Sequence, residues 1–123
     1  MPSALVNGVR LNYVQMAAPE AGGPHEDLVM VHGLATNMAF WYFHYAAVFA
    51  RRFRVTLYDL RGHGRSELPS DGYTPQNMAR DLESLLDHLA VPRAHFLVHS
   101  FGGVITLNMA QVAPCLLYTS DAA

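Results

Sequence analysis

Apolar and polar positions first alternate along this chain and then form mainly apolar runs, which predicts two kinds of β-sheet. Residues 4–6 and 9–14 lie on either side of Asn7-Gly8, a dipeptide typical of a type I′ turn, and their alternation predicts an antiparallel hairpin. Three later segments are predominantly apolar: 28–31, 53–58 and 94–98. Such runs are typical of strands that are buried on both faces, as in a parallel sheet.

Helical patterns occupy the segments between these strands. Thr74 followed by Pro75 is typical of a helix start, because threonine caps free N–H groups and proline fits the first helical turn. The apolar stripe that follows has helical spacing: Met78, Leu82, Leu85, Leu86 and Leu89. Two further segments predict helices: 38–52, which is rich in aromatic residues, and 104–113. Two segments predict loops: 17–26 and 60–73. Strands that alternate with helices predict an α/β fold, a mostly parallel sheet with helices on both faces, entered through the antiparallel hairpin.

Composition narrows the classes of protein. At 123 residues the chain can form one domain, and 51% apolar against 15% charged residues indicates that much of it is covered. A net charge of −2 and a single dense basic cluster at 51–54 argue against nucleic-acid binding. No apolar run approaches the ~18 residues of a membrane helix, no leader pattern opens the chain, and Cys115 is its single cysteine. We therefore expect a cytoplasmic protein that binds neither membranes nor nucleic acids.

The strongest chemical signal is Ser100, which follows an apolar run and precedes Phe101 and two glycines. It lies on the turn between a predicted strand and a predicted helix, where its hydroxyl is exposed and the first free N–H groups of the helix point at the group that it attacks. All seven histidines precede Ser100, so no histidine after the serine in this chain can act as its base. None of them stands at metal-ligand spacing with carboxylates or cysteines, so we expect no metal site.

Three motifs follow one another at the ends of predicted strands: 32–34 (HGL), 59–66 (DLRGHGRS) and 99–103 (HSFGG). In this order, over roughly residues 4–113, they resemble the N-terminal half of the α/β-hydrolase family. The similarity is to its branch of small esterases, lactonases, carbon–carbon hydrolases and cofactor-free haloperoxidases. The resemblance implies that Ser100 attacks the carbonyl of a small acyl substrate without a cofactor, and that the backbone N–H groups of Leu34 and Phe101 hold the oxyanion.

The same resemblance suggests supporting roles around the nucleophile. We expect His32 to shape the oxyanion loop, and Gly33 to leave room for the substrate carbonyl, since any side chain there would obstruct it. In the family the catalytic acid follows the serine, so Asp59 is interpreted as holding the loop 61–66 rather than as that acid. His99 is expected in the core or in a supporting position, and Gly102 as part of the turn at the nucleophile.

Two features depart from the family. Its pattern Gly-x-Ser-x-Gly has a glycine where this chain has Val98, so either the valine is tolerated or one glycine has been lost between Val98 and His99. Residues 115–123 do not continue the pattern and resemble translated sequencing-adapter sequence. We therefore interpret 1–114 as the N-terminal part of one α/β-hydrolase domain and 115–123 as a non-native tail.

Three functional hypotheses follow. The first is a truncated serine hydrolase, which is inactive as this fragment because the acid and the histidine of the triad are missing. The second is a relative of the same fold that uses Ser100 for perhydrolysis or carbon–carbon cleavage. The third is a non-catalytic binding module derived from a hydrolase.

Overall fold

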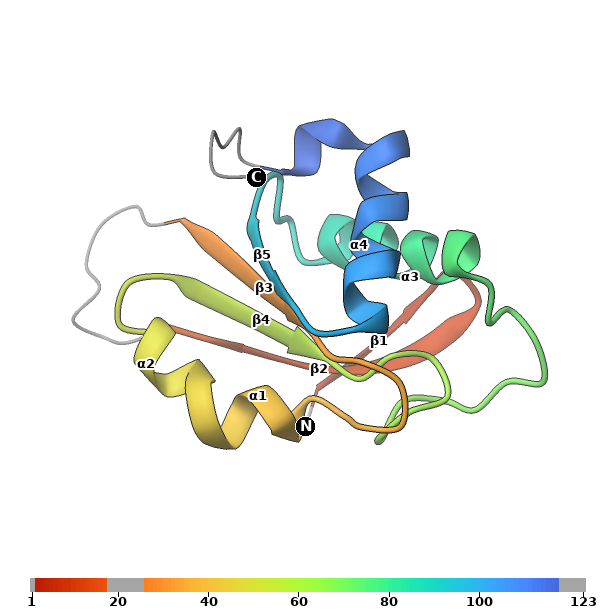
Figure 1. Ribbon diagram of the computed structural model, residues 1–123, viewed down its shortest axis with the longest axis horizontal. Helices are drawn as coiled ribbons and strands as arrows, with labels where there is room; N and C mark the ends of the chain where they lie inside the picture. The colour runs from red at the N-terminus through yellow and green to blue at the C-terminus, as the bar shows by residue number, and fades with distance from the viewer. Residues whose placement is uncertain (1, 18–25, 118–123) are drawn as a thin grey trace.

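The computed structural model describes residues 2–17 and 26–117, and these form a sheet with helices on both faces (Figure 1). The strands are β1 (Ser3–Val6), β2 (Val9–Met16), β3 (Asp27–Val31), β4 (Arg54–Tyr58) and β5 (His95–Val98). Their order in the sheet is β1-β2-β4-β3-β5. The pairs β4–β3 and β3–β5 are parallel, whereas β1–β2 and β2–β4 are antiparallel. The predicted α/β fold and its leading hairpin are confirmed.

The hairpin turn has the conformation that its sequence predicts. Asn7 has φ 49° and Gly8 has φ 74°, and Val6 pairs with Val9 directly beside them. Two consecutive positive φ angles are the mark of a type I′ turn, which suits the twist of the adjoining strands. β3 is buried along its whole length, as expected for a strand covered on both faces.

The helical elements are α1 (Ala39–Trp41), a π-helical turn (Tyr42–Ala46), α2 (Ala47–Phe49), α3 (Pro75–His88), α4 (Phe101–Val112) and a 3₁₀ turn (Pro114–Leu116). α1 and α2 cover one face of the sheet, and α3 and α4 cover the other (Figure 1). No helix among the described residues is long and apolar enough to cross a membrane.

α3 begins where its capping sequence predicts. The Asn77 N–H donates to Thr74 Oγ1 over 3.1 Å, and Pro75 occupies the first turn. Met78, Leu82 and the Leu85-Leu86 pair are buried against the sheet, and Leu89 packs at the edge of the same cluster. The predicted apolar stripe is therefore the face that α3 buries.

The prediction of one helix over residues 38–52 is wrong in its length and regularity. The helical segment ends at Phe49, and its middle turn is π-helical. A π turn adds one residue, so the buried positions fall at Trp41, Ala46 and Ala50, five and then four residues apart. The extra residue brings the small alanines against the sheet and turns Phe43 outward, where it is 76% exposed.

β5 lies at one edge of the sheet, next to β3 alone among the described strands. On its other side the described residues form a single parallel bridge from Ala94 to Leu117, next to a hydrogen bond from the Ala94 N–H to the Leu116 carbonyl (2.8 Å). The rest of the segment interpreted as a non-native tail, residues 118–123, lies outside the described residues, as do residues 18–25 of the predicted loop.

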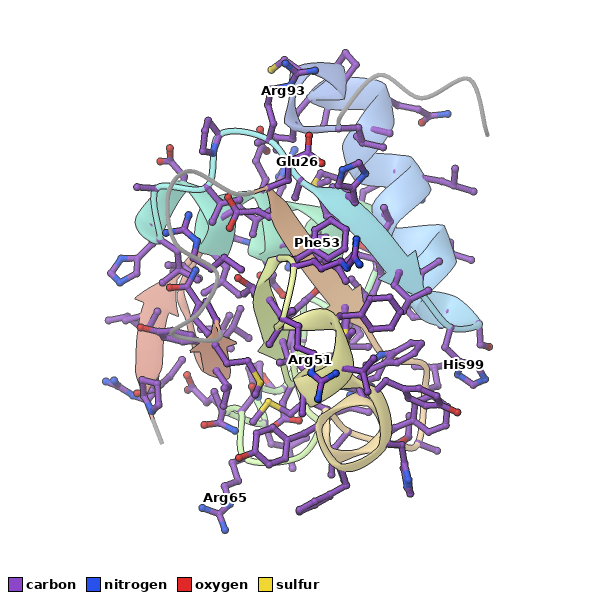
Figure 2. The ribbon with its side chains drawn as sticks, turned by 90° about the vertical axis from the view of Figure 1, so that its left-hand side faces the viewer. Glu26, Arg51, Phe53, Arg65, Arg93 and His99 are labelled. Carbon is purple, nitrogen blue, oxygen red and sulfur yellow. The ribbon has the colours of Figure 1, made fainter. Side chains whose placement is uncertain are left out.

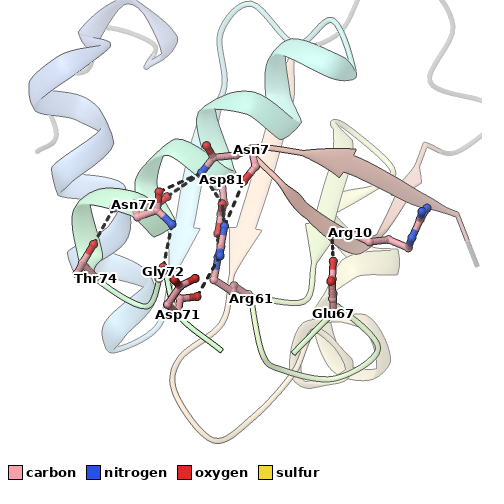
Figure 3. A network of polar contacts seen from close by, with 9 residues as sticks. All are labelled: Asn7, Arg10, Arg61, Glu67, Asp71, Gly72, Thr74, Asn77 and Asp81. Carbon is pink, nitrogen blue, oxygen red and sulfur yellow. Dashed lines mark hydrogen bonds and ion pairs between the residues drawn. The ribbon is translucent and has the colours of Figure 1, made fainter. Parts of the chain in front are cut away.

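A buried ion pair joins three distant segments (Figure 3). The Arg61 guanidinium donates two hydrogen bonds to the Asp81 carboxylate on α3, both of 2.9 Å, and both side chains are almost fully buried. The Asn7 side chain of the hairpin turn donates to Asp81 Oδ1 over 2.8 Å, and Arg61 also donates to the Asn7 carbonyl. The pair therefore links the hairpin turn, the loop after β4 and the middle of α3.

Removing half of this pair leaves a buried charge without its partner. We expect Asp81→Asn to lower the free energy of unfolding by about 3–5 kcal/mol, measured by urea denaturation. A double variant, Arg61→Met with Asp81→Leu, removes both charges and is expected to cost less than the single change. An equal or greater loss in the double variant would contradict this account.

Candidate active site

Ser100 sits on a strained turn between β5 and α4. Its φ of 54° and ψ of −119° lie outside the regions that residues with side chains ordinarily adopt. Such a conformation costs about 1–3 kcal/mol and persists only where the surrounding structure imposes it. The turn exposes Ser100 and makes Phe101 the first residue of α4, at the end of the helix whose N–H groups lack intrahelical acceptors.

The expected start of this helix at residue 104 is wrong, because α4 begins directly after the serine. Glycines 102 and 103 suggest a turn by sequence, yet both are helical. A Cβ on Gly102 would lie 2.6 Å from the carbonyl oxygen of Val31 and 2.8 Å from that of His32. The absence of a side chain therefore lets the first turn of α4 rest on the end of β3.

Gly33 makes a second close contact at the nucleophile. A Cβ at this position would lie 3.1 Å from Ser100 Cβ and 3.1 Å from the His99 carbonyl oxygen. The loop after β3 and the turn after β5 are thus in contact, and the two expected oxyanion donors each follow this contact directly: Leu34 comes after Gly33, and Phe101 comes after Ser100. Leu34 is exposed, as a residue at an open site must be.

Val98 is accommodated in this turn. It pairs with Val31 as the last residue of β5, and its Cγ2 lies 3.4 Å from the position of a Cβ on Gly103, an ordinary contact distance. The strained serine geometry is present with valine in the position where the family pattern has glycine.

The two glycines of α4 provide a matched pair of substitutions. Gly102→Ala forces a methyl group into backbone carbonyls, so we expect it to lower the free energy of unfolding by about 1–3 kcal/mol. Gly103→Ala meets only a side chain at 3.4 Å and gains helix propensity, so we expect it to be neutral or stabilising by up to about 1 kcal/mol. Urea denaturation of both variants tests the contact, and equal effects would contradict it.

His32 holds the oxyanion loop from inside the protein. Its Nε2 accepts the Leu60 N–H over 3.0 Å, so the proton lies on Nδ1, which donates to the Gly33 carbonyl over 2.7 Å. The Gly33 carbonyl and the Leu34 N–H belong to one trans peptide unit and point in opposite directions. By holding the carbonyl, His32 sets the direction of the Leu34 N–H.

The environment of His32 favours the neutral imidazole. Burial lowers its pKa from the ordinary value of 6.5, while the hydrogen bond to Gly33 opposes that effect without overcoming it. Below pH 6.5 the unfolded chain binds a proton at this position that the folded chain does not bind. The His32 contribution to stability is therefore present at neutral pH and decreases as the pH falls below about 6.5.

This linkage predicts how a His32→Gln variant depends on pH. At pH 8 the variant should be less stable than the parent chain, because it loses the buried imidazole contacts. Below pH 6.5 the difference should shrink by at most about 1.4 kcal/mol per pH unit, because the parent loses stability that the variant does not have. Urea denaturation at pH 8, 6 and 5 measures this, and a constant difference would disprove the linkage.

Asp59 organises the loop after β4. Its buried carboxylate accepts hydrogen bonds from the Asn12 side chain (2.8 Å), the Met38 N–H (2.9 Å) and the Arg65 N–H (3.0 Å). A side chain on Gly64 would overlap the same carboxylate. Asp59 therefore ties residues 61–66 to β2 and to the start of the helical segment, and these contacts use its carboxylate for structure.

His99 lies at the rim of the site. The side chain is exposed directly after β5 (Figure 2). Its ring stacks on that of Phe40, with ring centroids 5.2 Å apart. The exposed ring rules out the core alternative for His99, and a supporting position stays a prediction. In the neighbouring aromatic stretch 40–45, Trp41 is buried. Phe40 and Tyr45 are partly exposed, and their ring centroids lie 6.1 Å apart.

The chemistry of the site is incomplete within the described residues. No side chain among them hydrogen-bonds to Ser100 Oγ, and no group of three or more metal-ligand residues occurs among them. A pocket of about 230 Å³ lies beside Asp59 and Tyr42, but Ser100 does not line it. Among the described residues, the structure thus contains the expected nucleophile, Ser100, and the two loops that carry the expected oxyanion donors.

Sequence reasoning missed two groups that build the site. The Arg61–Asp81 pair joins residues 20 positions apart, and no local pattern shows that both side chains are buried. His63 contacts the ring of His32 at a centroid distance of 5.4 Å and bonds to the oxyanion loop. Arg61 and His63 both belong to the motif 59–66, for which the sequence predicts only a loop supported by Asp59.

Comparison with known proteins identifies the family. A family model described as alpha/beta hydrolase fold matches residues 28–116, well over half of the chain. The chain therefore belongs to the α/β-hydrolase family.

Several relatives carry different activities in their names. The chain is 37% identical over 111 residues, 90% of its length, to the dihydrolipoyllysine-residue acetyltransferase component of the acetoin cleaving system of Pseudomonas putida. It is 39% identical over 98 residues, 77% of its length, to the putative carbamate hydrolase RutD of Variovorax paradoxus. Similarity also extends to bifunctional epoxide hydrolase 2 of Mus musculus, at 30% identity over 87% of this chain.

Solved structures show the same fold. The enol-lactonase of Burkholderia xenovorans superposes with a TM-score of 0.85 and 33% identity over 94% of this chain and 44% of its own. Est816, described as an N-acyl homoserine lactone degrading enzyme, gives a TM-score of 0.84 at 33% identity and covers 94% of this chain and 42% of its own. The chain spans 29%, 37% and 19% of the three curated relatives in the order given above.

Proposed function

We propose that the complete protein is a serine hydrolase that cleaves esters or related acyl substrates through an acyl-enzyme on Ser100. The observation that carries this proposal is the strained Ser100 turn in contact with the Gly33 loop. This contact supports Ser100 as the nucleophile and the N–H groups of Leu34 and Phe101 as the donors to the oxyanion. The fold alone supports many chemistries, so the proposed function rests on the residues of this site.

The geometry supports acyl transfer in two steps. Ser100 Oγ attacks the substrate carbonyl while its proton passes to a general base, and the carbonyl oxygen becomes an oxyanion held by the N–H groups of Leu34 and Phe101. The intermediate then expels the protonated leaving group, and water cleaves the resulting serine ester by the reverse sequence. Each oxyanion donor is worth roughly 3–4 kcal/mol of barrier.

A serine nucleophile favours acyl substrates over epoxides. Attack of an alkoxide on an epoxide carbon forms an ether, which has no carbonyl for water to attack and would leave the enzyme blocked. Attack on an ester, lactone or carbamate forms a carbonyl ester that water can cleave. The lactonase and carbamate hydrolase names among the relatives fit this chemistry better than the epoxide hydrolase names.

We expect little or no turnover by the 123-residue chain on its own. None of the described residues supplies a base to Ser100 Oγ, and loss of the serine or the histidine from a comparable triad costs about 10⁶ in turnover. This same observation favours the third hypothesis, a non-catalytic binding module derived from a hydrolase. Perhydrolysis and carbon–carbon cleavage use the same nucleophile and stay as alternatives within the first proposal.

The first test is covalent labelling of Ser100. Resequencing the source DNA across codon 114 establishes the reading frame, and the product is treated with a fluorophosphonate probe. If the frame continues, we expect labelling that Ser100→Ala abolishes and that Ser70→Ala, an exposed loop serine, retains. Labelling that persists in Ser100→Ala would exclude Ser100 as the nucleophile. A frame that ends at Ala123, with no labelling above background, would favour the binding module.

A further inference from the structure

The Leu34 residue lies between two peptide units that are each held by an imidazole. On its N-terminal side, the Gly33 carbonyl accepts from His32 Nδ1 over 2.7 Å. On its C-terminal side, the Ala35 N–H donates to His63 Nε2 over 3.3 Å. These two contacts fix the peptide planes before and after the residue whose N–H serves the oxyanion.

The two imidazoles link the same two loops, and each side chain comes from one loop and bonds to the backbone of the other. His32 comes from the end of β3 and reaches the Leu60 N–H after β4. His63 comes from the loop after β4, anchors its Nδ1–H on the Arg61 carbonyl over 2.9 Å, and reaches back to Ala35. The rings lie 5.4 Å apart at 57°, so each limits the movement of the other.

Ala35 supplies a second, independent observation. Its φ of 63° is left-handed, a conformation that costs a residue with a side chain roughly 1–2 kcal/mol and is uncommon for alanine. Such strain persists only where other contacts impose it. Among the described contacts of the Ala35 backbone, the bond to His63 is the one that reaches across from another loop.

We infer that His63 is a positioning residue for the oxyanion site: its Nε2 accepts the Ala35 N–H, maintains the left-handed Ala35 and so fixes the direction of Leu34. The inference rests on the proposed function for the role given to Leu34. In this role His63 needs no contact with the substrate. It acts through the loop, and its partner in this task is His32.

Two substitutions separate hydrogen bonding from packing. His63→Phe keeps a ring of similar size but has no acceptor, whereas His63→Gln retains an acceptor at a similar reach. Solvent exchange of the Ala35 amide, measured by NMR on the ¹⁵N-labelled 123-residue chain, reports the contact directly. We expect exchange roughly fivefold faster in His63→Phe than in the parent, with most of the protection restored in His63→Gln.

The Leu60 amide is the internal control, because it donates to His32 and not to His63. We expect its exchange to stay within twofold of the parent in both variants. A purely structural role for the ring predicts the same Ala35 protection in His63→Phe as in the parent, and that result would overturn the inference. Equal loss in the Gln and Phe variants would overturn it as well.

The parent chain provides a test that needs no variant. Imidazole ¹⁵N spectra near pH 7.5 should show the His63 proton on Nδ1, because Nε2 accepts from Ala35. A proton on Nε2 would overturn the inference even if a variant fails to fold. Fluorophosphonate labelling of Ser100 is a separate measurement, so a failure of the proposed function and a failure of the His63 contact are distinguished.

Discussion

The contact between the first turn of α4 and the end of β3 determines where the nucleophile lies. Gly102 rests on the carbonyls of Val31 and His32 at a distance that no side chain permits, and the parallel register of β3 and β5 brings the two strand ends to the same level. Ser100 bridges this short gap and therefore adopts a strained backbone conformation. The position of α4, the exposure of the serine and the approach of the Gly33 loop all follow from this one contact.

The loops after β3 and β4 need a separate explanation, because irregular backbone near a core must find partners for its N–H and C=O groups. Here side chains supply them. His32 bonds to the Gly33 carbonyl and the Leu60 N–H, and Asp59 accepts from Met38 and Arg65. These loops are thus held by the buried His32 imidazole and one buried carboxylate, and the contacts give both groups structural roles.

The part of the α/β-hydrolase fold present in this chain carries some of the groups that the proposed reaction needs. This part of the fold carries the proposed nucleophile and the proposed backbone donors, which lie at strand ends and at the start of a helix. Among the described residues no base or acid meets Ser100. The relatives extend well beyond the region that this chain matches.

Local patterns were sufficient for much of the fold. Asn7-Gly8 has the positive φ angles of its turn, and Thr74 caps the helix whose stripe packs on the sheet, since these features depend on neighbouring residues only. The motif order predicted the family and placed Ser100 on its turn. Tertiary structure alone decided the π turn at Tyr42–Ala46, the start of α4 at Phe101, the burial of Arg61 with Asp81 and the contact of His63 with Ala35. Each of these depends on a segment distant in sequence, and periodicity along one element carries no information about the groups that pack against it.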